Sequence, residues 1–84
     1  METTTLSPQE RKEQFIQELQ KRIESRLGGN SLTTTFETCS SAPAYGWSVE
    51  EYMYMPMVAQ RLREKGYSVS SSVNWGVTDW LIAV

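Results

Sequence analysis

The N-terminal third of the chain has the spacing of apolar residues that an amphipathic helix requires. Between Phe15 and Leu27, apolar side chains recur at steps of three and four residues in an otherwise charged segment. Ser7 and Glu10 stand at capping-box spacing before this segment, and a Gly-Gly pair follows it. The sequence therefore predicts one long helix over residues 8–27.

The rest of the chain alternates between the periods of strands and helices. Residues 31–38 alternate between apolar or threonine side chains and polar ones, which predicts a strand. A second capping-box pattern predicts a helix over 49–65, kinked or split at Pro56 because proline cannot continue the hydrogen-bond ladder. The period of two returns over 67–75 and 80–84, which predicts two antiparallel strands joined by a short hairpin loop.

Together these elements predict an α+β fold. We expect a single small domain, residues 1–84, with the order α-β-α-β-β and a three-stranded antiparallel sheet packed against two helices. The last strand is apolar on both faces, which favours a central or well-covered position. Residues 1–6 are expected to form a frayed lead. A domain of 84 residues buries only part of its surface and often gains stability from oligomerisation.

The cysteine content and the N-terminal sequence indicate the cellular compartment in which we expect this protein. Cys39 is the only cysteine, whereas a small secreted domain would usually carry a framework of disulfides. The N-terminus lacks the basic-then-apolar order of a signal peptide, and no apolar run approaches the roughly 18 residues of a membrane span. We therefore expect a cytoplasmic protein without membrane contact.

The absence of histidine restricts the chemistry further. It removes Ser-His-Asp and Cys-His nucleophile systems together with the commonest metal ligand. A single cysteine is too few for a structural zinc site of the usual kind. A glycine-rich phosphate-binding loop precedes a helix, whereas the Gly-Gly pair here follows one. Adjacent carboxylates such as Glu50 and Glu51 are typical of a helix N-terminus, where they interact with the dipole. We expect no enzyme, no cofactor and no metal site.

The strongest functional signal lies in residues 45–57, which hold four aromatic residues and three of the four methionines. Consecutive helical residues point about 100° apart, so these side chains cannot all face one core. Tyrosine, tryptophan and methionine are enriched in protein interfaces, and methionine adapts to partners of varied shape. The alternative is a core wrapped from two sides that leaves a tyrosine half-exposed. The candidate partner-binding residues are Tyr45, Trp47, Tyr52, Met53, Tyr54 and Met55.

This signal supports a leading hypothesis of a non-enzymatic binding protein. Such a protein would cover another protein's surface or assemble with itself, and the long first helix favours a homodimer. A less favoured version places the aromatic loop as a lid over a small ligand or nucleotide, because aromatic rings also stack on bases.

A second hypothesis rests on the basic residues. Arg61, Arg63 and Lys65 lie at the end of the second helix in RLREK, directly before GYSV and the predicted hairpin. This order resembles the helix-plus-wing half of a winged helix, and the resemblance implies a nucleic-acid-binding module that uses these three residues. The net charge of −2 argues against a whole surface aimed at phosphates, and cations at a helix C-terminus also offset its dipole.

The segments VAQRLREKGYSV and DWLIAV give the chain a wider resemblance. In them a helix closes on KGY and feeds a strand, and a tryptophan leads the C-terminal strand. This pattern resembles the small α+β accessory proteins encoded by tailed bacteriophages. The resemblance implies a protein of the host cytoplasm that binds and inhibits a host protein, or serves as a small virion or replication accessory.

Overall fold

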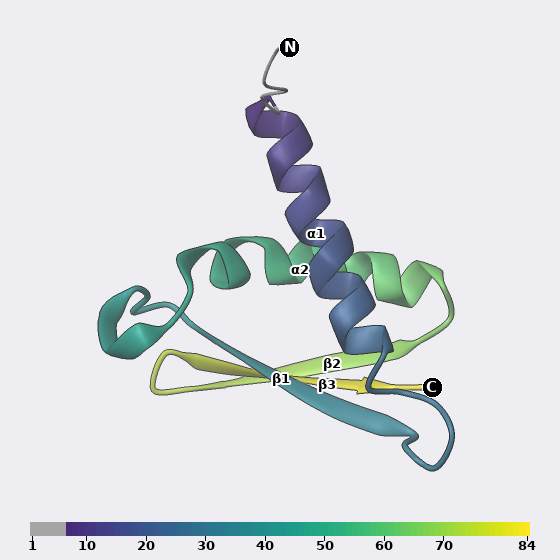
Figure 1. The fold of residues 1–84 in the computed structure, drawn as a ribbon. Helices are drawn as coiled ribbons and strands as arrows, with labels where there is room; N and C mark the ends of the chain where they lie inside the picture. Colours follow the sequence, from purple (N-terminus) through teal and green to yellow (C-terminus); the bar gives the residue numbers. More distant parts are fainter. Residues whose placement is uncertain (1–6) are drawn as a thin grey trace.

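The computed structural model describes residues 7–84 as two helices over a three-stranded sheet (Figure 1). The predicted α+β class and element order are thereby confirmed, whereas the frayed lead expected at 1–6 lies outside the described residues. In chain order the elements are α1 (Pro8–Glu24), β1 (Thr33–Cys39), the 3-10 turn η1 (Ala44–Gly46), α2 (Val49–Glu64), β2 (Ser68–Asn74) and β3 (Val77–Ala83).

The sheet has the order β1-β3-β2, and both pairings are antiparallel. The C-terminal strand β3 is therefore central, as its apolar character on both faces predicts. Ile82 lies opposite Thr34 on one side and Val69 on the other, and it is fully buried. Because side chains alternate along a strand, these residues share the face of the sheet that packs on the helices.

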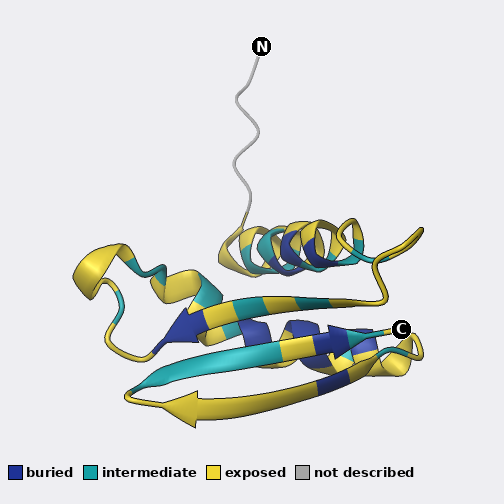
Figure 2. Ribbon diagram, turned by 90° about the horizontal axis from the view of Figure 1, so that it is seen from below, coloured by how far each residue is buried: buried dark blue, intermediate teal, exposed yellow. Residues whose placement is uncertain are grey.

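Helix α2 lies over one face of the sheet, and α1 lies toward the β1 edge (Figure 1 and Figure 2). Helix α2 contacts both β1 and β2, and α1 packs mainly on α2, crossing it in Figure 1. Neither helix within residues 7–84 has the length and apolar character needed to cross a bilayer. The buried core joins both helices and the sheet and consists of Ile16, Leu19, Ile23, Met55, Val58, Ala59, Leu62, Val69 and Ile82.

The elements differ from the expected ones mainly in three places, and their other boundaries shift by one or two residues. Helix α1 ends at Glu24 instead of residue 27, and α2 runs through Pro56 without splitting. The larger difference is the hairpin, which turns at Trp75 and Gly76, so that β3 begins at Val77 and not at residue 80. Both turn residues have positive φ, 53° and 80°, which is the geometry of a two-residue hairpin turn that matches the twist of its strands.

Met55 supplies a test of this core. It is fully buried, whereas Met57 on the same helix is 40% exposed. We expect Met55→Ala to lower the free energy of unfolding by about 2–5 kcal/mol, because it leaves a cavity between the layers. Met57→Ala is the matched control and should change it by less than about 1 kcal/mol. Urea denaturation measures both, and equal losses would contradict the placement of Met55 in the core.

Candidate protein-binding surface

Two of the six candidate interface residues belong to the interior. Met55 is fully buried, and Tyr54 is half-buried with its ring centroid 5.7 Å from that of Phe15 on α1. The ammonium group of Lys12 lies 5.8 Å from the centre of the Tyr54 ring. Met55 therefore does not contribute to a binding surface, and Tyr54 holds the two helices together.

The other four candidates lie at or near the surface. Tyr45 in η1 is 95% exposed, and Met53 and Tyr52 on the first half of α2 are 54% and 41% exposed. Trp47 is half-buried between η1 and α2. The expected set thus divides, as the 100° turn per residue requires, into side chains that face the core and side chains that face solvent.

The structure adds Trp75, which the sequence placed inside a strand. It occupies the hairpin turn and is 98% exposed. The flanking Asn74 and Gly76 are turn formers and were the available signal, but tryptophan is not a usual turn residue. The backbone N–H of Ser40 donates to the carbonyl oxygen of Gly76 at 2.9 Å, which ties the hairpin tip to the segment leading into η1. Figure 1 shows η1 and the hairpin tip at the same end of the molecule.

Both exposed rings are carried by left-handed backbone. Tyr45 has φ 59° and Trp75 has φ 53°. For residues other than glycine and asparagine this conformation costs roughly 1–2 kcal/mol. Rings that are 95% and 98% exposed gain almost no packing energy within the chain to offset it. Such strained positions cluster at functional sites in proteins.

A groove of about 460 Å³ opens between the first half of α2 and the helix-facing side of β2 and β3. The indole N–H of Trp80 donates to Thr38 Oγ1 at 3.1 Å, so the ring forms an apolar floor with its polar atom satisfied. Every side chain that lines the groove within residues 7–84 is uncharged: Thr38, Tyr52, Met53, Pro56, Ser71, Val73, Thr78 and Trp80.

Charge is unevenly distributed along the chain. All eight basic residues fall within 11–26 and 61–65, and the charged residues of the other segments are all carboxylates. Glu37 and Asp79 lie opposite each other on β1 and β3, on the face of the sheet away from the groove, and hydrogen bonding and like charge from Asp79 raise the pKa of Glu37. The segments that form η1, the hairpin and the groove wall are therefore apolar or acidic.

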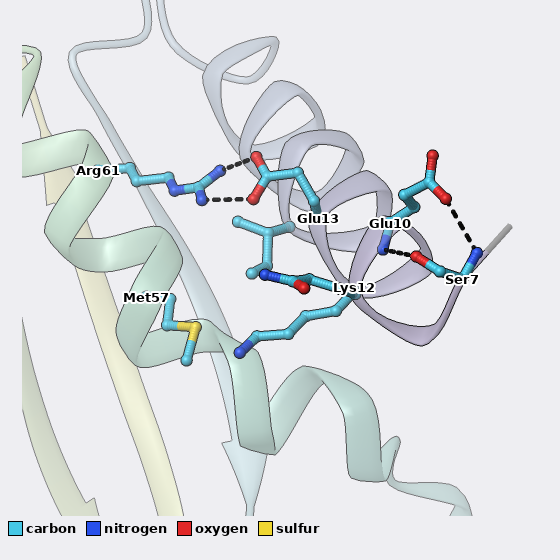
Figure 3. A pocket seen from close by; sticks show the side chains of 8 residues that line it. Ser7, Glu10, Lys12, Glu13, Met57 and Arg61 are labelled. Carbon is cyan, nitrogen blue, oxygen red and sulfur yellow. Dashed lines mark hydrogen bonds and ion pairs between the residues drawn. The ribbon is translucent and has the colours of Figure 1, made fainter.

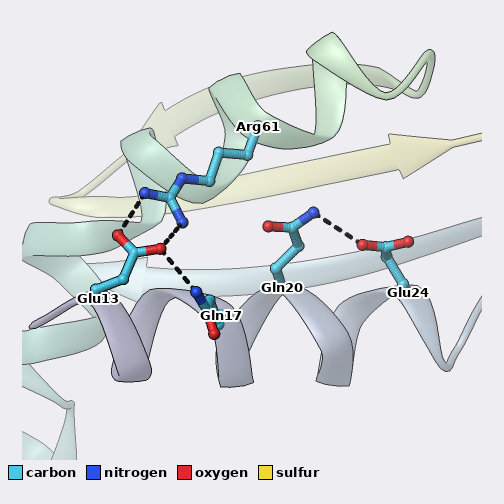
Figure 4. A network of polar contacts seen from close by, with 5 residues as sticks. All are labelled: Glu13, Gln17, Gln20, Glu24 and Arg61. Atoms are coloured by element: carbon cyan, nitrogen blue, oxygen red, sulfur yellow. Dashed lines mark hydrogen bonds and ion pairs between the residues drawn. The ribbon is translucent and has the colours of Figure 1, made fainter. Parts of the chain in front are cut away.

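Each of the three candidate phosphate-binding residues is paired with another group of the chain. Arg61 donates to both carboxylate oxygens of Glu13, at 2.6 and 2.7 Å (Figure 4). Arg63 donates to the carbonyl oxygen of Val69 at 2.9 Å, and the ammonium of Lys65 lies 2.9 Å from Glu24. A phosphate would have to displace these contacts. The geometry therefore favours a structural role for all three, as helix-end cations that join α2 to its neighbours.

A second hollow, of about 400 Å³, lies beside the N-terminal turn of α1 and is drawn in Figure 3. Four of its polar side chains already have partners: Ser7 and Glu10 form a reciprocal capping box, and Glu13 pairs with Arg61. Within the part of the chain that the structure describes, no group of three potential metal-ligating side chains is assembled.

Comparison with protein-family models, curated proteins and solved structures finds no match to this chain. Its function is therefore inferred from the geometry of its own residues.

The ion pair between the helices predicts a pH dependence. The hydrogen bonds from Arg61, with a smaller contribution from Gln17, lower the pKa of Glu13 to about 2. An acid whose pKa is lower in the folded state stabilises the fold above its unfolded pKa, and this contribution is lost as the pH falls from about 4.5 toward 2. We expect the wild-type melting temperature to fall more steeply across this window than that of Glu13→Gln. Glu18→Gln, at an exposed position of α1, should keep the wild-type slope, and equal slopes for all three would contradict the assignment.

The strained turn predicts a gain in stability. We expect Trp75→Asn to raise the free energy of unfolding by about 0.5–1 kcal/mol, because asparagine tolerates positive φ and the exposed ring contributes no packing. The melting temperature should rise by about 2–8 °C in a thermal scan followed by circular dichroism. Gly76→Ala should lower it, because the added Cβ would lie 3.0 Å from Ser40 Oγ at φ +80°. A destabilised Trp75→Asn would show that the ring packs on the fold.

Proposed function

We propose that this chain is a non-enzymatic protein-binding module that acts through its aromatic end. The aromatic end is the surface formed by Tyr45, Tyr52, Met53, Val73 and Trp75 around the groove. The observation that carries the proposal is the pair of almost fully exposed rings, Tyr45 and Trp75, held at one end of the molecule by strained backbone.

Interface physics supports a protein as the partner. Tyrosine, tryptophan and methionine dominate the buried centres of protein interfaces, where a few aromatic anchors supply most of the binding energy. The groove is lined by uncharged side chains and offers no cation to a phosphate or to an acidic small molecule. This favours a protein surface over a nucleotide held under an aromatic lid, and the internal pairing of Arg61, Arg63 and Lys65 makes nucleic-acid binding the weaker alternative.

The biological form of the proposal follows from the resemblance to phage accessory proteins. A small domain that binds through its aromatic end is suited to act as an inhibitor or accessory protein that covers the surface of a host protein. That resemblance stays a prediction, as does the host cytoplasm as its location. A homodimer through the aromatic end is the other form, in which the partner is a second copy of this chain.

The test is capture of a partner by immobilised protein from a lysate of the native host. Retention of the partner should fall at least about tenfold for the double variant Tyr45→Ser, Trp75→Asn, because aromatic anchors commonly contribute 2 kcal/mol or more. Leu32→Ser is the matched control, since Leu32 is 66% exposed and lies at the other end of the sheet. Circular dichroism checks that each variant remains folded.

Retention that is unchanged in the double variant, or reduced equally in the control, would contradict a role of the aromatic end. Light scattering at two concentrations identifies the homodimer form: self-association that the double variant abolishes makes the second copy the partner.

A further inference from the structure

We propose, building on the proposed function, that the aromatic end binds an extended basic segment of its partner. This segment adds as a fourth strand to the free edge of β2 and places apolar side chains in the adjacent groove. The order β1-β3-β2 leaves β2 at an edge of the sheet, and Figure 2 shows it exposed along most of its length.

The hairpin turn fixes which backbone groups of β2 point outward. In a two-residue hairpin, the residues that flank the turn, here Asn74 and Val77, form a hydrogen-bonded pair. Alternate residues of β2 from Asn74 backward therefore bond to β3, and the residues between them direct N–H and C=O groups to the edge. The edge-directed residues are Val69, Ser71 and Val73.

A contact of Arg63 supports this assignment. Its guanidinium donates to the carbonyl oxygen of Val69 at 2.9 Å, as an edge-directed carbonyl permits. At the opposite edge of the sheet, Arg26, which follows α1, donates to the carbonyl oxygen of Thr35 in β1 at 3.3 Å. Helix α1 lies beside this edge in Figure 2. Ser71 and Val73 on β2 are exposed and remain accessible to a partner strand.

Edge strands usually carry features that prevent pairing with other chains, such as charged residues, prolines or bulges. The seven residues of β2, SVSSSVN, include neither a charge nor a proline, and their register with β3 runs without a bulge. This edge is therefore chemically open to strand addition.

The groove lies directly beside this edge. Ser71 and Val73 contribute to the groove lining with their side chains and to the edge with their backbone. A strand paired with them would point every second side chain toward Tyr52, Met53 and Pro56 on α2. Because the lining is uncharged, those side chains are expected to be apolar.

Charge complementarity determines the remaining side chains. Glu50 is exposed on α2, three residues before Met53, and Asp79 lies opposite Ser72 of β2 on the other face of the sheet, where the alternate side chains of an added strand would point. The chain carries no lysine or arginine over 27–60 or 66–84, which include η1, the hairpin and the groove wall. A partner segment with lysine or arginine beside its apolar residues would meet carboxylates, and the faces of Tyr45 and Trp75 can also accept a cation.

The test begins with a displayed library of random peptides of about eight residues, the length of β2, selected on the immobilised full chain. We expect enrichment of peptides in which apolar residues alternate with lysine or arginine. The best peptide is then synthesised in three forms: unchanged, with glutamate at its basic positions, and with N-methyl groups on every second amide. Fluorescence anisotropy should show at least about tenfold weaker binding for both altered forms, because one loses charge attraction and the other loses hydrogen bonds to the edge.

Protein variants locate the site. Ser71→Pro removes one edge-directed N–H and leaves the ladder with β3 intact, whereas Ser71→Ala keeps that N–H. We expect at least about tenfold weaker peptide binding for the proline variant and a change of less than about twofold for the alanine variant. Glu50→Lys should weaken the basic peptide and strengthen its glutamate form. Should Ser71→Pro fail to fold, the N-methylated peptide decides the same question on the wild-type chain.

Three results would contradict the pairing of a partner strand with β2. These are a library without enrichment, enrichment of acidic peptides, and binding that is weakened neither by Ser71→Pro nor by N-methylation of the peptide. The proposed function is tested separately by Tyr45 and Trp75 in the lysate capture. If the peptides fail while capture still depends on those two rings, the partner presents a folded surface, and the inference fails without the function.

Discussion

The burial of α2 on two sides is the constraint on which the rest of the structure depends. Val58 and Leu62 are fully buried because α1 covers one side of the helix and the sheet covers the other. Helix α1 crosses α2 in Figure 1 and contacts both of its halves, through Glu51 near the start and Arg61 near the end. Tyr52 and Met53 lie on a side of α2 that faces neither α1 nor the core, and they stay exposed. The groove is the space between this side of α2 and the sheet.

The polar contacts around the crossing have a second consequence, the separation of charge. Glu13 and Glu24 on α1 draw Arg61 and Lys65 of α2 into ion pairs, and the hydroxyl of Tyr67 also donates to Glu24 at 3.1 Å. Each partly exposed pair contributes little to stability by itself. Together they hold Arg61 and Lys65 against α1, away from the acidic and apolar segments that form the groove, whereas Arg63 contacts the start of β2 at Val69. The charge pattern that favours a basic partner thus follows from how the helices are joined.

Local sequence rules, such as helix capping and the spacing of apolar residues, correctly predicted the features that depend only on neighbouring residues. The Ser7 and Glu10 capping box is present, and the stripe of Ile16, Leu19 and Ile23 is buried, because cap and period lie within a single helix. The sequence also indicated that the side chains of 45–57 could not all be buried together.

The division of these residues could not be predicted, because it depends on distant parts of the chain. Met55 is inside and Met53 outside through the rotation of α2 relative to α1, which adjacent residues do not encode. The hairpin turn was misplaced for a different reason: its first position normally takes asparagine, aspartate or glycine, and here it holds Trp75. Local sequence rules give the wrong prediction where a residue occupies a conformation that its type rarely adopts, as Trp75 does in this turn.

The features that depart from these local sequence rules lie at one end of the molecule. A sequence that specifies its fold well is consistent across levels, and departures from consistency concentrate at functional sites. Here two aromatic residues adopt left-handed backbone, an edge strand lacks its usual protection, and a groove stays open. None of these features stabilises the isolated domain, and all occur on the hairpin, η1 or the adjoining part of the groove. A partner that covers this end would supply the burial and the strand pairing that the chain alone does not provide.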